Sequence, residues 1–459
     1  MSVSKRMVRD KYSMASLYEL SACEAVEKIA KREVSPFEFV QSLLYRIESL
    51  EPNLKAWAVV DAKGALTAAR QSESVLASGQ QPRLLEGLPL GIKDVYYTAG
   101  LRTSAASPIL ANFVPEEDAG AVDRLRRAGA IILGKTVTTQ FASGVPSPTH
   151  NPWNYERTPG GSSSGSGAAV SARMVPAALG TQSGGSILRP AAYCGVVGLK
   201  PTFGRISRRN VLQCAWSLDT MGVISRNVCD AALLFQALAG YDLRDAGSFD
   251  VPVEDYVTAS RTPKMPRLGL IREFLDRCTL DGRLQTEKAA LQLEQAGASV
   301  QEVSFPGDFD LAHACCKIIL NAEKAEIHSL WHAKHPQSYA AGLRANIEVG
   351  QLIPAVSYLR AQRWRRWFRN AVEGLFTNFD ALLCPSAPDV APNISTTGKS
   401  IFLAPWTMLG LPAISLPSGL NAEGLPFGIQ LVTRAWDEAN LLSAARWCED
   451  VFGMLPPPC

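Results

Sequence analysis

The chain has 459 residues, of which 46 are Lys or Arg, 43 are Asp or Glu and 47% are hydrophobic. The net charge of +3 gives no sign of a nucleic-acid partner, and the 19% charged fraction excludes a disordered chain. No apolar run approaches the roughly 20 residues of a membrane span. No apolar segment follows the basic N-terminal residues, so we expect no secretory signal, no membrane association and a cytoplasmic location.

The expected elements of the first half alternate between helix and strand, which is typical of an α/β sheet. Residues 15–50 have the spacing of two amphipathic helices, and the pair Ser35-Pro36 is a helix-start signal for the second. The remaining expectations are a core strand at 88–95, a helix at 120–129, a strand at 130–134 and a tightly packed helix at 168–180.

The second half begins with a polar connection at 241–266 and continues with a helical pattern over 310–378. Its arginine-rich part, 359–370, reads as a solvated amphipathic helix rather than an RNA contact, because Trp364, Trp367 and Phe368 share one face. The tail predicts strands at 379–388, 411–419 and 426–432 and a helix at 437–451. Strand patterns at both ends predict one sheet assembled from the whole chain.

Cysteines and histidines give no metal-site pattern. None of the ten cysteines forms a CxxC pair, and we expect buried, reduced thiols. His328 and His332 are four residues apart, but no HExxH glutamate accompanies them, so we interpret them as part of a polar helix surface. We therefore expect neither a metal nor a cofactor.

Two Gly/Ser-rich segments, 159–167 and 183–186, are candidates for chemistry. The first segment lacks the lysine of a phosphate-binding P-loop, because Ser166 stands there, and Val170 replaces the third glycine of a dinucleotide fingerprint. Gly161 to Gly165 does match GxSxG, which would make Ser163 an esterase nucleophile with a histidine downstream. This esterase alternative stays open at the level of the sequence.

A further interpretation uses both segments together. A buried lysine loses its proton easily and can activate a serine without histidine. Lys93 lies in the apolar stretch LPLGIKDV, and the two segments supply Ser162 and Ser186. Gly184 and Gly185 allow a turn whose N–H groups converge on an oxyanion.

These segments resemble the amidase signature family. The similarity runs from about residue 15 to 448 and is strongest in GGSSSGSGAAV (160–170) and LGTQSGGSILRPAAYCGVVGLKPTFGR (179–205). The separation of 24 positions from Ser162 to Ser186 equals the spacing in the family's Ser–cisSer–Lys triad. The resemblance implies one domain with a large mixed β-sheet flanked by helices on both faces, a catalytic core at about 60–240 and 379–450, and a variable helical region at about 270–378.

The resemblance also implies roles for individual residues. Ser186 is the nucleophile, Ser162 is the bridging serine after a cis peptide bond with Gly161, Lys93 is the base and Ser163 supports Lys93 by a hydrogen bond. The main-chain N–H groups of the segment Ser183, Gly184, Gly185 and Ser186 form the oxyanion hole.

The sequence departs from the family's usual GTDTGGSIRxPA at two places. Gln182 replaces the aspartate, and Leu188 stands where the arginine is usual, with Arg189 one position later. This arrangement is similar to the malonamidase-type branch, in which the shifted arginine contacts a substrate carboxylate. The alternative for Arg189 is a buried ion pair.

We accordingly predict an amidase that hydrolyses linear amides through an acyl-enzyme, with esters, anilides and carbamates as further substrates. The expected partner is a small-molecule amide, and a homodimer is compatible with the sequence. The alternatives are the A subunit of a glutamine-dependent amidotransferase, a GxSxG serine esterase and a non-catalytic binding protein on the same fold. Gln182, Leu188 and the near-zero net charge favour the free-standing amidase over the amidotransferase component.

Overall fold

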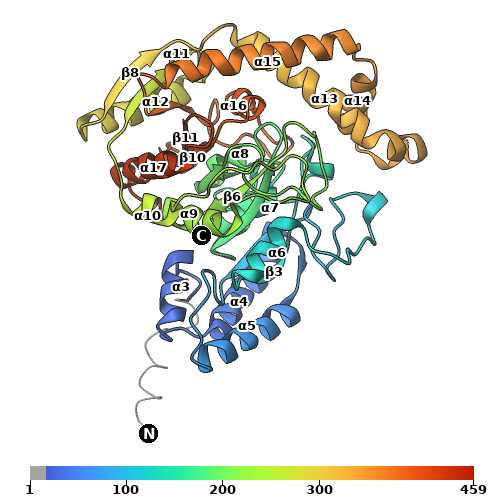
Figure 1. Ribbon diagram of the computed structural model, residues 1–459, viewed down its shortest axis with the longest axis vertical. Coiled ribbons are helices and arrows are strands. Elements are labelled where there is room, and N and C mark those ends of the chain that lie inside the picture. Colours follow the sequence, from blue (N-terminus) through green and yellow to red (C-terminus); the bar gives the residue numbers. More distant parts are fainter. Residues whose placement is uncertain (1–16, 459) are drawn as a thin grey trace.

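Short apolar runs form the strands of one mixed sheet in the computed structural model, which describes residues 17–458 (Figure 1). The N-terminal basic stretch and Cys459 lie outside these residues. Within them the sheet has eleven strands in the order β1-β3-β2-β4-β6-β5-β10-β11-β9-β7-β8. The strands are β1 (Trp57–Val60), β2 (Pro89–Lys93), β3 (Ile131–Thr136), β4 (Ala177–Gln182), β5 (Val197–Lys200), β6 (Thr220–Ser225), β7 (Arg267–Ile271), β8 (Ser299–Val303), β9 (Ala381–Pro385), β10 (Ala413–Leu420) and β11 (Pro426–Val432).

Helices cover both faces of this sheet, as the fully buried central strands require. The helices are α3 (Ala22–Ala30), α4 (Pro36–Leu54), α5 (Ala62–Ala77), α6 (Gly120–Arg127), α7 (Ser164–Ser171), α8 (Leu188–Cys194), α9 (Val228–Leu238), α10 (Tyr256–Arg261), α11 (Arg272–Leu275), α12 (Leu280–Gln295), α13 (Phe309–Lys334), α14 (Ala341–Gln351), α15 (Ala355–Leu375), α16 (Ala404–Leu409) and α17 (Glu438–Phe452), with short 3₁₀ turns η1 (Pro108–Leu110), η2 (Gln140–Ala142) and η3 (Pro336–Ser338). Helices α7 and α8 pack on one face, and α9 and α17 pack on the other. None of these helices combines the length and apolar character needed to cross a membrane.

The predicted mixed α/β fold is confirmed. Strand β2 pairs in parallel with β3 and β4, whereas β4 pairs antiparallel with β6 and β10 pairs antiparallel with β11. The predicted start of α4 is also present, since the side chain of Ser35 accepts hydrogen bonds from the N–H groups of Phe37 and Glu38.

Two sequence expectations need correction. The helix expected at 168–180 is α7, which ends at Ser171, and the following Ala177–Gln182 is the central strand β4. Small residues such as Ala178 and Gly180 suit either a packed helix or a strand buried on both faces, so periodicity alone did not separate them. The variable region expected to be helical also contains strand β8, which pairs with β7 at one edge of the sheet.

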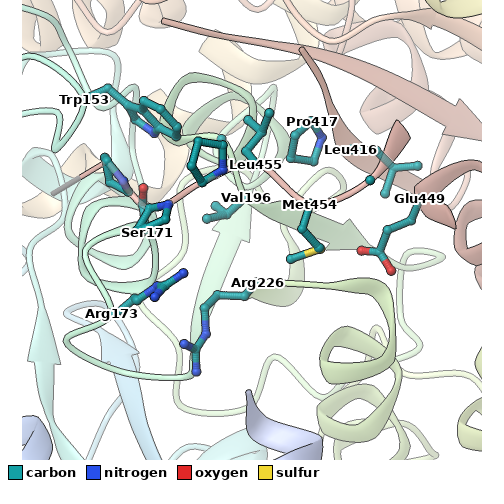
Figure 2. Close-up of a pocket in the computed structure, with 15 residues that line it drawn as sticks. Trp153, Ser171, Arg173, Val196, Arg226, Leu416, Pro417, Glu449, Met454 and Leu455 are labelled. Atoms are coloured by element: carbon teal, nitrogen blue, oxygen red, sulfur yellow. The ribbon is translucent and has the colours of Figure 1, made fainter. Parts of the chain in front are cut away.

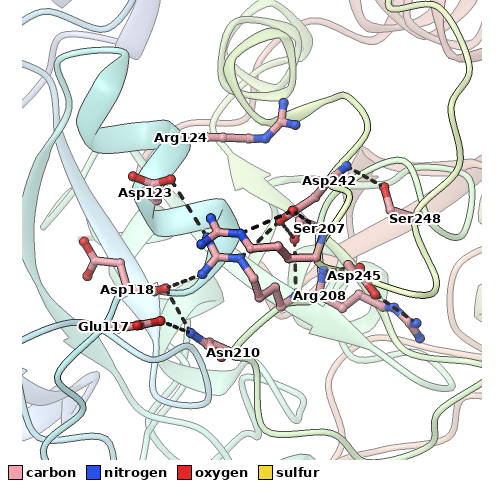
Figure 3. A network of polar contacts seen from close by, with 12 residues as sticks. Glu117, Asp118, Asp123, Arg124, Ser207, Arg208, Asn210, Asp242, Asp245 and Ser248 are labelled. Carbon is pink, nitrogen blue, oxygen red and sulfur yellow. Dashed lines mark hydrogen bonds and ion pairs between the residues drawn. The ribbon is translucent and has the colours of Figure 1, made fainter.

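The polar connection after α9 is fixed to the rest of the molecule by a network of arginines and aspartates (Figure 3). Ser207 donates to Asp242 at 2.6 Å, and the guanidinium of Arg209 lies 3.2 Å from the same carboxylate. The main-chain N–H of Arg208 donates to Asp245 at 2.7 Å. These contacts hold the loop that follows β5 against the segment that follows α9.

Helices α13, α14 and α15 lie together over one end of the molecule, with α15 running along the outer edge (Figure 1). On α15, Phe368 is buried, but Trp364 and Trp367 are 41% and 48% exposed, so the predicted aromatic face is only partly covered. Arg365 points inward and donates to the hydroxyl and the carbonyl of Ser217, each at 2.9 Å. Thus α15 is fastened to the body by one of the arginines that were expected in solvent.

Candidate active site

Lys93 is the last residue of β2 and is fully buried. Its Nζ donates to Ser162 Oγ at 2.7 Å and to Thr181 Oγ1 at 2.7 Å. Burial lowers the pKa of Lys93 to about 7, although the nearby Cys214 and Asp219 act in the opposite direction. A lysine with this lowered pKa is partly neutral near pH 7, and the neutral amine can accept a proton from the serine hydroxyl that it contacts.

The first Gly/Ser segment carries Ser162 into the start of α7. The peptide bond between Gly161 and Ser162 is cis, and the carbonyl of Ser162 accepts a hydrogen bond from the N–H of Thr139 at 3.2 Å. Ser163 was expected to bond Lys93. Instead its Oγ accepts from the N–H of Thr181 at 3.3 Å and lies 3.4 Å from the carbonyl of the same residue.

Thr181 was not identified from the sequence, although its hydroxyl takes the place beside Lys93 that Ser163 was expected to fill. It lies on β4, which pairs in parallel with β2. A threonine at this position does not by itself indicate a contact with a lysine. Only the pairing of these two strands, which is not readable from either segment alone, brings the hydroxyl to the lysine.

Ser186 lies in the loop between β4 and α8 and is 8% exposed. Its carbonyl accepts a hydrogen bond from the N–H of Ser163 at 3.3 Å. This bond brings the loop of Ser186 against the residue that follows Ser162. The structure therefore brings the three predicted triad residues into one buried region of the molecule.

The N–H groups of Gly184, Gly185 and Ser186 have no hydrogen-bond acceptor within residues 17–458. A Cβ on Gly185 would lie 2.8 Å from side-chain atoms of both Leu403 and Ser400, so only glycine fits this close approach. Unpaired N–H groups on a tightly packed turn are what an oxyanion hole requires. Their arrangement supports the predicted role of this segment.

Side chains from distant segments hold the turn in place. Ser183 donates to the carboxylate of Asp219, which also accepts from the main-chain N–H groups of Cys214 at 2.6 Å and Ala215 at 3.1 Å. The hydroxyl of Thr407 donates to the carbonyl of Gly184 at 2.9 Å. Neither Asp219 nor Thr407 lies in a motif that marked it in the sequence.

Gln182, the first departure from the family pattern, is fully buried and is hydrogen-bonded at both the oxygen and the nitrogen of its carboxamide. Its carboxamide oxygen accepts from the N–H groups of Ile187 at 2.8 Å and Leu188 at 3.0 Å, and its nitrogen donates to Thr407 at 2.9 Å. A neutral amide thus ties the start of α8 to α16 without adding a negative charge close to the turn. The support around Ser186 is uncharged at this position.

Arg189, the second departure, bonds only to main-chain carbonyls among the described residues. Its Nη2 and Nε donate to the carbonyl of Gly161 at 2.5 and 3.1 Å, and its Nη1 donates to the carbonyl of Gly398 at 2.6 Å. Burial lowers the pKa of Arg189 to about 10. The ion pair that was the alternative for Arg189 is not seen in residues 17–458, and the guanidinium instead holds the carbonyl that precedes Ser162.

No histidine is a hydrogen-bond partner of Ser162, Ser163 or Ser186 in the described chain. His328, expected on a polar surface, is fully buried, and burial lowers its pKa to about 4. Its Nδ1 lies 3.1 Å from the hydroxyl of Tyr339. The esterase interpretation, which needs a histidine beside Ser163, therefore has no structural support.

One pocket of the structure lies apart from these residues, between the C-terminal tail and the edges of several elements (Figure 2). Trp153, Arg226, Glu449 and Met454 line it. Glu449 accepts from the N–H of Val228 at 2.9 Å, and its pKa is raised to about 7 by burial. Arg226 donates to the carbonyls of Tyr18, Glu19 and Leu20, and Met454 is exposed.

Comparison with known proteins relates the chain to enzymes acting on amide groups. The chain is 37% identical to a Geotalea daltonii protein and 38% identical to a Roseiflexus castenholzii protein, each named as the A subunit of glutamyl-tRNA(Gln) amidotransferase. Each alignment covers 94% of this chain, and they cover 96% and 95% of the two relatives.

Solved structures of related proteins have a similar fold over nearly the whole chain. The native peptide amidase of Stenotrophomonas maltophilia superposes with a TM-score of 0.84 at 29% identity, over 96% of this chain and 98% of that one. A structure described as a vestigial protein complex, with bearing on the origins of an s-triazine catabolic enzyme, has a TM-score of 0.90 at 31% identity, over 96% of this chain and all of the other. The family model for amidases matches residues 38–442. The chain belongs to the amidase signature family.

Proposed function

We propose that this protein breaks the C–N bond of an amide through an acyl-enzyme formed on Ser186. The observation that carries the proposal is the 2.7 Å hydrogen bond from fully buried Lys93 to Ser162, in a region that also holds Ser186. The unpaired N–H groups of Gly184 and Gly185 support it, because they are available to bind the oxygen of a tetrahedral intermediate.

The proton path follows from the order of the groups. Neutral Lys93 takes the proton of Ser162, and Ser162 takes that of Ser186 as Ser186 attacks the carbonyl carbon. The tetrahedral intermediate then collapses, the C–N bond breaks and Ser162 returns a proton to the leaving amine. Water attacks the acyl-enzyme by the same path in the second half. Esters, anilides and carbamates carry the same electrophilic carbon and are included as substrates.

A second candidate function is the same chemistry carried out within a multi-subunit enzyme. The names of the relatives favour an A subunit of a glutamine-dependent amidotransferase, which would release ammonia from glutamine for use by other subunits. This was the alternative raised by the sequence, and the relatives support it better than they support a free-standing enzyme. The uncharged Gln182 and the position of Arg189 are the features that favour the free-standing amidase.

The test uses the purified full-length chain with short amides, anilides, carbamates and glutamine. We expect release of ammonia or amine, labelling by a serine-directed fluorophosphonate, and an acyl adduct on the peptide that contains Ser186. The Ser186→Ala variant should show none of these. Turnover of simple amides by the chain alone supports the free-standing enzyme, whereas glutamine turnover only with co-purified proteins supports the amidotransferase. Wild-type activity in the Ser186→Ala variant would overturn the proposal.

A further inference from the structure

Ser217 lies in the loop between β5 and β6 and is held by side chains of the helical region. Its N–H and its hydroxyl donate to the carboxylate of Glu323 on α13 at 2.8 and 2.6 Å. Its hydroxyl and its carbonyl accept from the guanidinium of Arg365 on α15, each at 2.9 Å. Every polar group of this serine is thus bonded to one of two charged side chains.

The two charged side chains are themselves shielded from water. Glu323 is 9% exposed, and its carboxylate also accepts from the hydroxyl of Tyr358 at 2.8 Å. Arg365 is half-buried, and burial lowers its pKa, although the charge of Glu323 acts in the opposite direction. Hydrogen bonds to charged groups are about twice as strong as those between neutral groups. The contacts from α13 and α15 therefore fix the position of Ser217.

The residues on either side of Ser217 form a closed turn. The N–H groups of Leu218 and Asp219 donate to the carbonyl of Ala215 at 3.2 and 2.9 Å. The carboxylate of Asp219 accepts from the N–H groups of Cys214 at 2.6 Å and Ala215 at 3.1 Å. Ser217 therefore lies inside a turn that is closed by the carboxylate of Asp219.

Asp219 connects this turn to the segment Ser183–Ser186, the oxyanion turn. Its buried carboxylate accepts a hydrogen bond from the hydroxyl of Ser183, the first residue of that segment. The main chain continues from Ser183 through Gly184 and Gly185 to Ser186. A continuous series of contacts thus runs from α13 and α15 to the residues whose N–H groups we assign to the oxyanion hole.

We propose that Glu323 and Arg365 are positioning residues that act on the oxyanion turn through Asp219, an inference that rests on the proposed amide hydrolysis. The N–H groups of an oxyanion hole stabilise the transition state only when they point at the developing charge, and a small displacement lowers the rate strongly. They contribute little to binding of the substrate in its ground state. Loss of either side chain should therefore lower kcat and leave KM almost unchanged.

The test measures kcat and KM of full-length variants on the short amide that the wild type hydrolyses best. Arg365→Met removes both bonds from α15, and Arg366→Met is the matched control, because Arg366 is exposed on the same helix. We expect Arg365→Met to have a kcat about tenfold lower and a KM within about twofold of the wild type, and Arg366→Met to match the wild type. Glu323→Gln keeps the shape of the side chain, should lower kcat about threefold, and takes the place of Arg365→Met if that variant does not fold. An unchanged kcat in the folded variant overturns the proposal.

A double-mutant cycle separates positioning from general support of the fold. Ser183→Ala removes the hydroxyl that is bonded to Asp219 and keeps every main-chain N–H of the oxyanion turn. If Arg365 acts through this hydroxyl, adding Arg365→Met to Ser183→Ala should lower kcat by less than about a further twofold. A full further tenfold loss, or a loss that appears in KM instead of kcat, means a structural role and overturns the proposal.

Hydrogen exchange tests the same connection without any turnover. Amide exchange in residues 183–188 and 214–220 should be about tenfold faster in Arg365→Met than in Arg366→Met. If the wild type hydrolyses no amide and this difference is present, the proposed function fails while the connection to the turn stands. If exchange is faster only in 214–220, or is unchanged in both segments, the contacts of Arg365 do not hold the oxyanion turn and the proposal is wrong.

Discussion

At the scale of single residues, the same side chain serves different purposes according to its contacts. Lys93 and Lys200 are both fully buried, and burial lowers the pKa of each to about 7. Lys93 donates to a serine hydroxyl, whereas Lys200 donates to the main-chain carbonyls of Pro201 and Leu411. A lowered pKa therefore does not by itself identify a catalytic lysine, and the proposed role of Lys93 rests on the serine hydroxyl that it contacts.

This pair provides a matched test of the base. Lys93→Met should reduce kcat on the order of 10³-fold, because the proton of Ser162 loses its acceptor and the triad acts as a unit. Lys200→Met removes an equally buried amine and should leave kcat within about threefold. The measurement is steady-state kinetics on each folded variant, with circular dichroism to verify folding. Equal losses of kcat in the two variants would mean that Lys93 contributes to the stability of the fold and not to proton transfer.

The pH dependence follows from the same lysine. The active form is neutral, and the pKa of Lys93 is lowered to about 7, so kcat/KM should rise as pH increases through about 7 and then remain level. Asp219 raises the pKa of Lys93, and Asp219→Asn should therefore move the midpoint to lower pH. The pH–rate profiles of the two proteins are the measurement. A profile that falls between pH 6 and 8, or an upward movement in Asp219→Asn, contradicts a neutral lysine base.

Residue types in a motif could be predicted from the sequence, but their contacts could not. The spacing of Ser162 and Ser186 and the apolar setting of Lys93 pointed to one site. The partner of Arg189 depended on where the carbonyl of Gly398 would fall, more than 200 positions along the chain. Thr407 reaches Gln182 over a similar separation. Such contacts depend on the packing of distant elements and have no local pattern.

At the scale of elements, α13 is joined to the catalytic body by a short hydrogen-bonded connection. The carboxamide of Gln140 donates to the carbonyl of Ser338 at 2.7 Å and accepts from the N–H of Ala340 at 2.8 Å. Beside it, Phe141 packs against Trp331 of α13 with ring centroids 5.4 Å apart. These contacts join the loop that supports Ser162 to the turn that follows α13.

The connection can be tested at Gln140. Gln140→Ala removes two hydrogen bonds worth about 0.5–1.5 kcal/mol each, and should speed amide hydrogen exchange in residues 336–342 by about tenfold. We also expect a lower kcat/KM, because the support of Ser162 loosens. Gln362→Ala on α15, which loses only a bond to the hydroxyl of Tyr358, serves as the control. Unchanged exchange in 336–342 would show that the connection does not hold the turn.

Helices and strands could be predicted from the sequence where apolar and polar residues alternate regularly. Where they do not, helix and strand could not be told apart. The amphipathic helix α4 and the apolar strand β10 stood out from the sequence. Strand β4 did not, since its residues Ala177–Gln182 are small, and both faces of it are buried. Strand β8 is mostly exposed at the edge of the sheet and lacks an apolar run, so it was absorbed into the helical region.

At the scale of the whole molecule, the sheet joins segments from all parts of the chain. Strand β5 pairs with β10, more than 200 residues away, and β11 pairs with β9. Close to this junction the buried guanidinium of Arg205 lies 3.5 Å from the carboxylate of Glu438 at the start of α17. The middle and the C-terminal part of the chain are thus held by a charge pair as well as by the sheet.

Breaking that pair should destabilise the whole protein in one cooperative step. Arg205→Met leaves Glu438 buried and unpaired, a change that costs about 3–5 kcal/mol. Adding Glu438→Gln should recover part of the loss. Denaturant unfolding followed by tryptophan fluorescence and circular dichroism is the measurement, and the two signals should give the same midpoint. A separate early transition for the C-terminal part would mean that the sheet does not unfold as a unit.

The burial of Lys93 also affects when its amine can accept a proton. Its low pKa comes mainly from the loss of hydration, so water reaching the amine would restore its affinity for a proton and leave Ser162 without an acceptor. On the proposed role of Lys93 as the base, exposure of the amine to water switches the base off and its reburial switches it on. Shielding and activation are then one event.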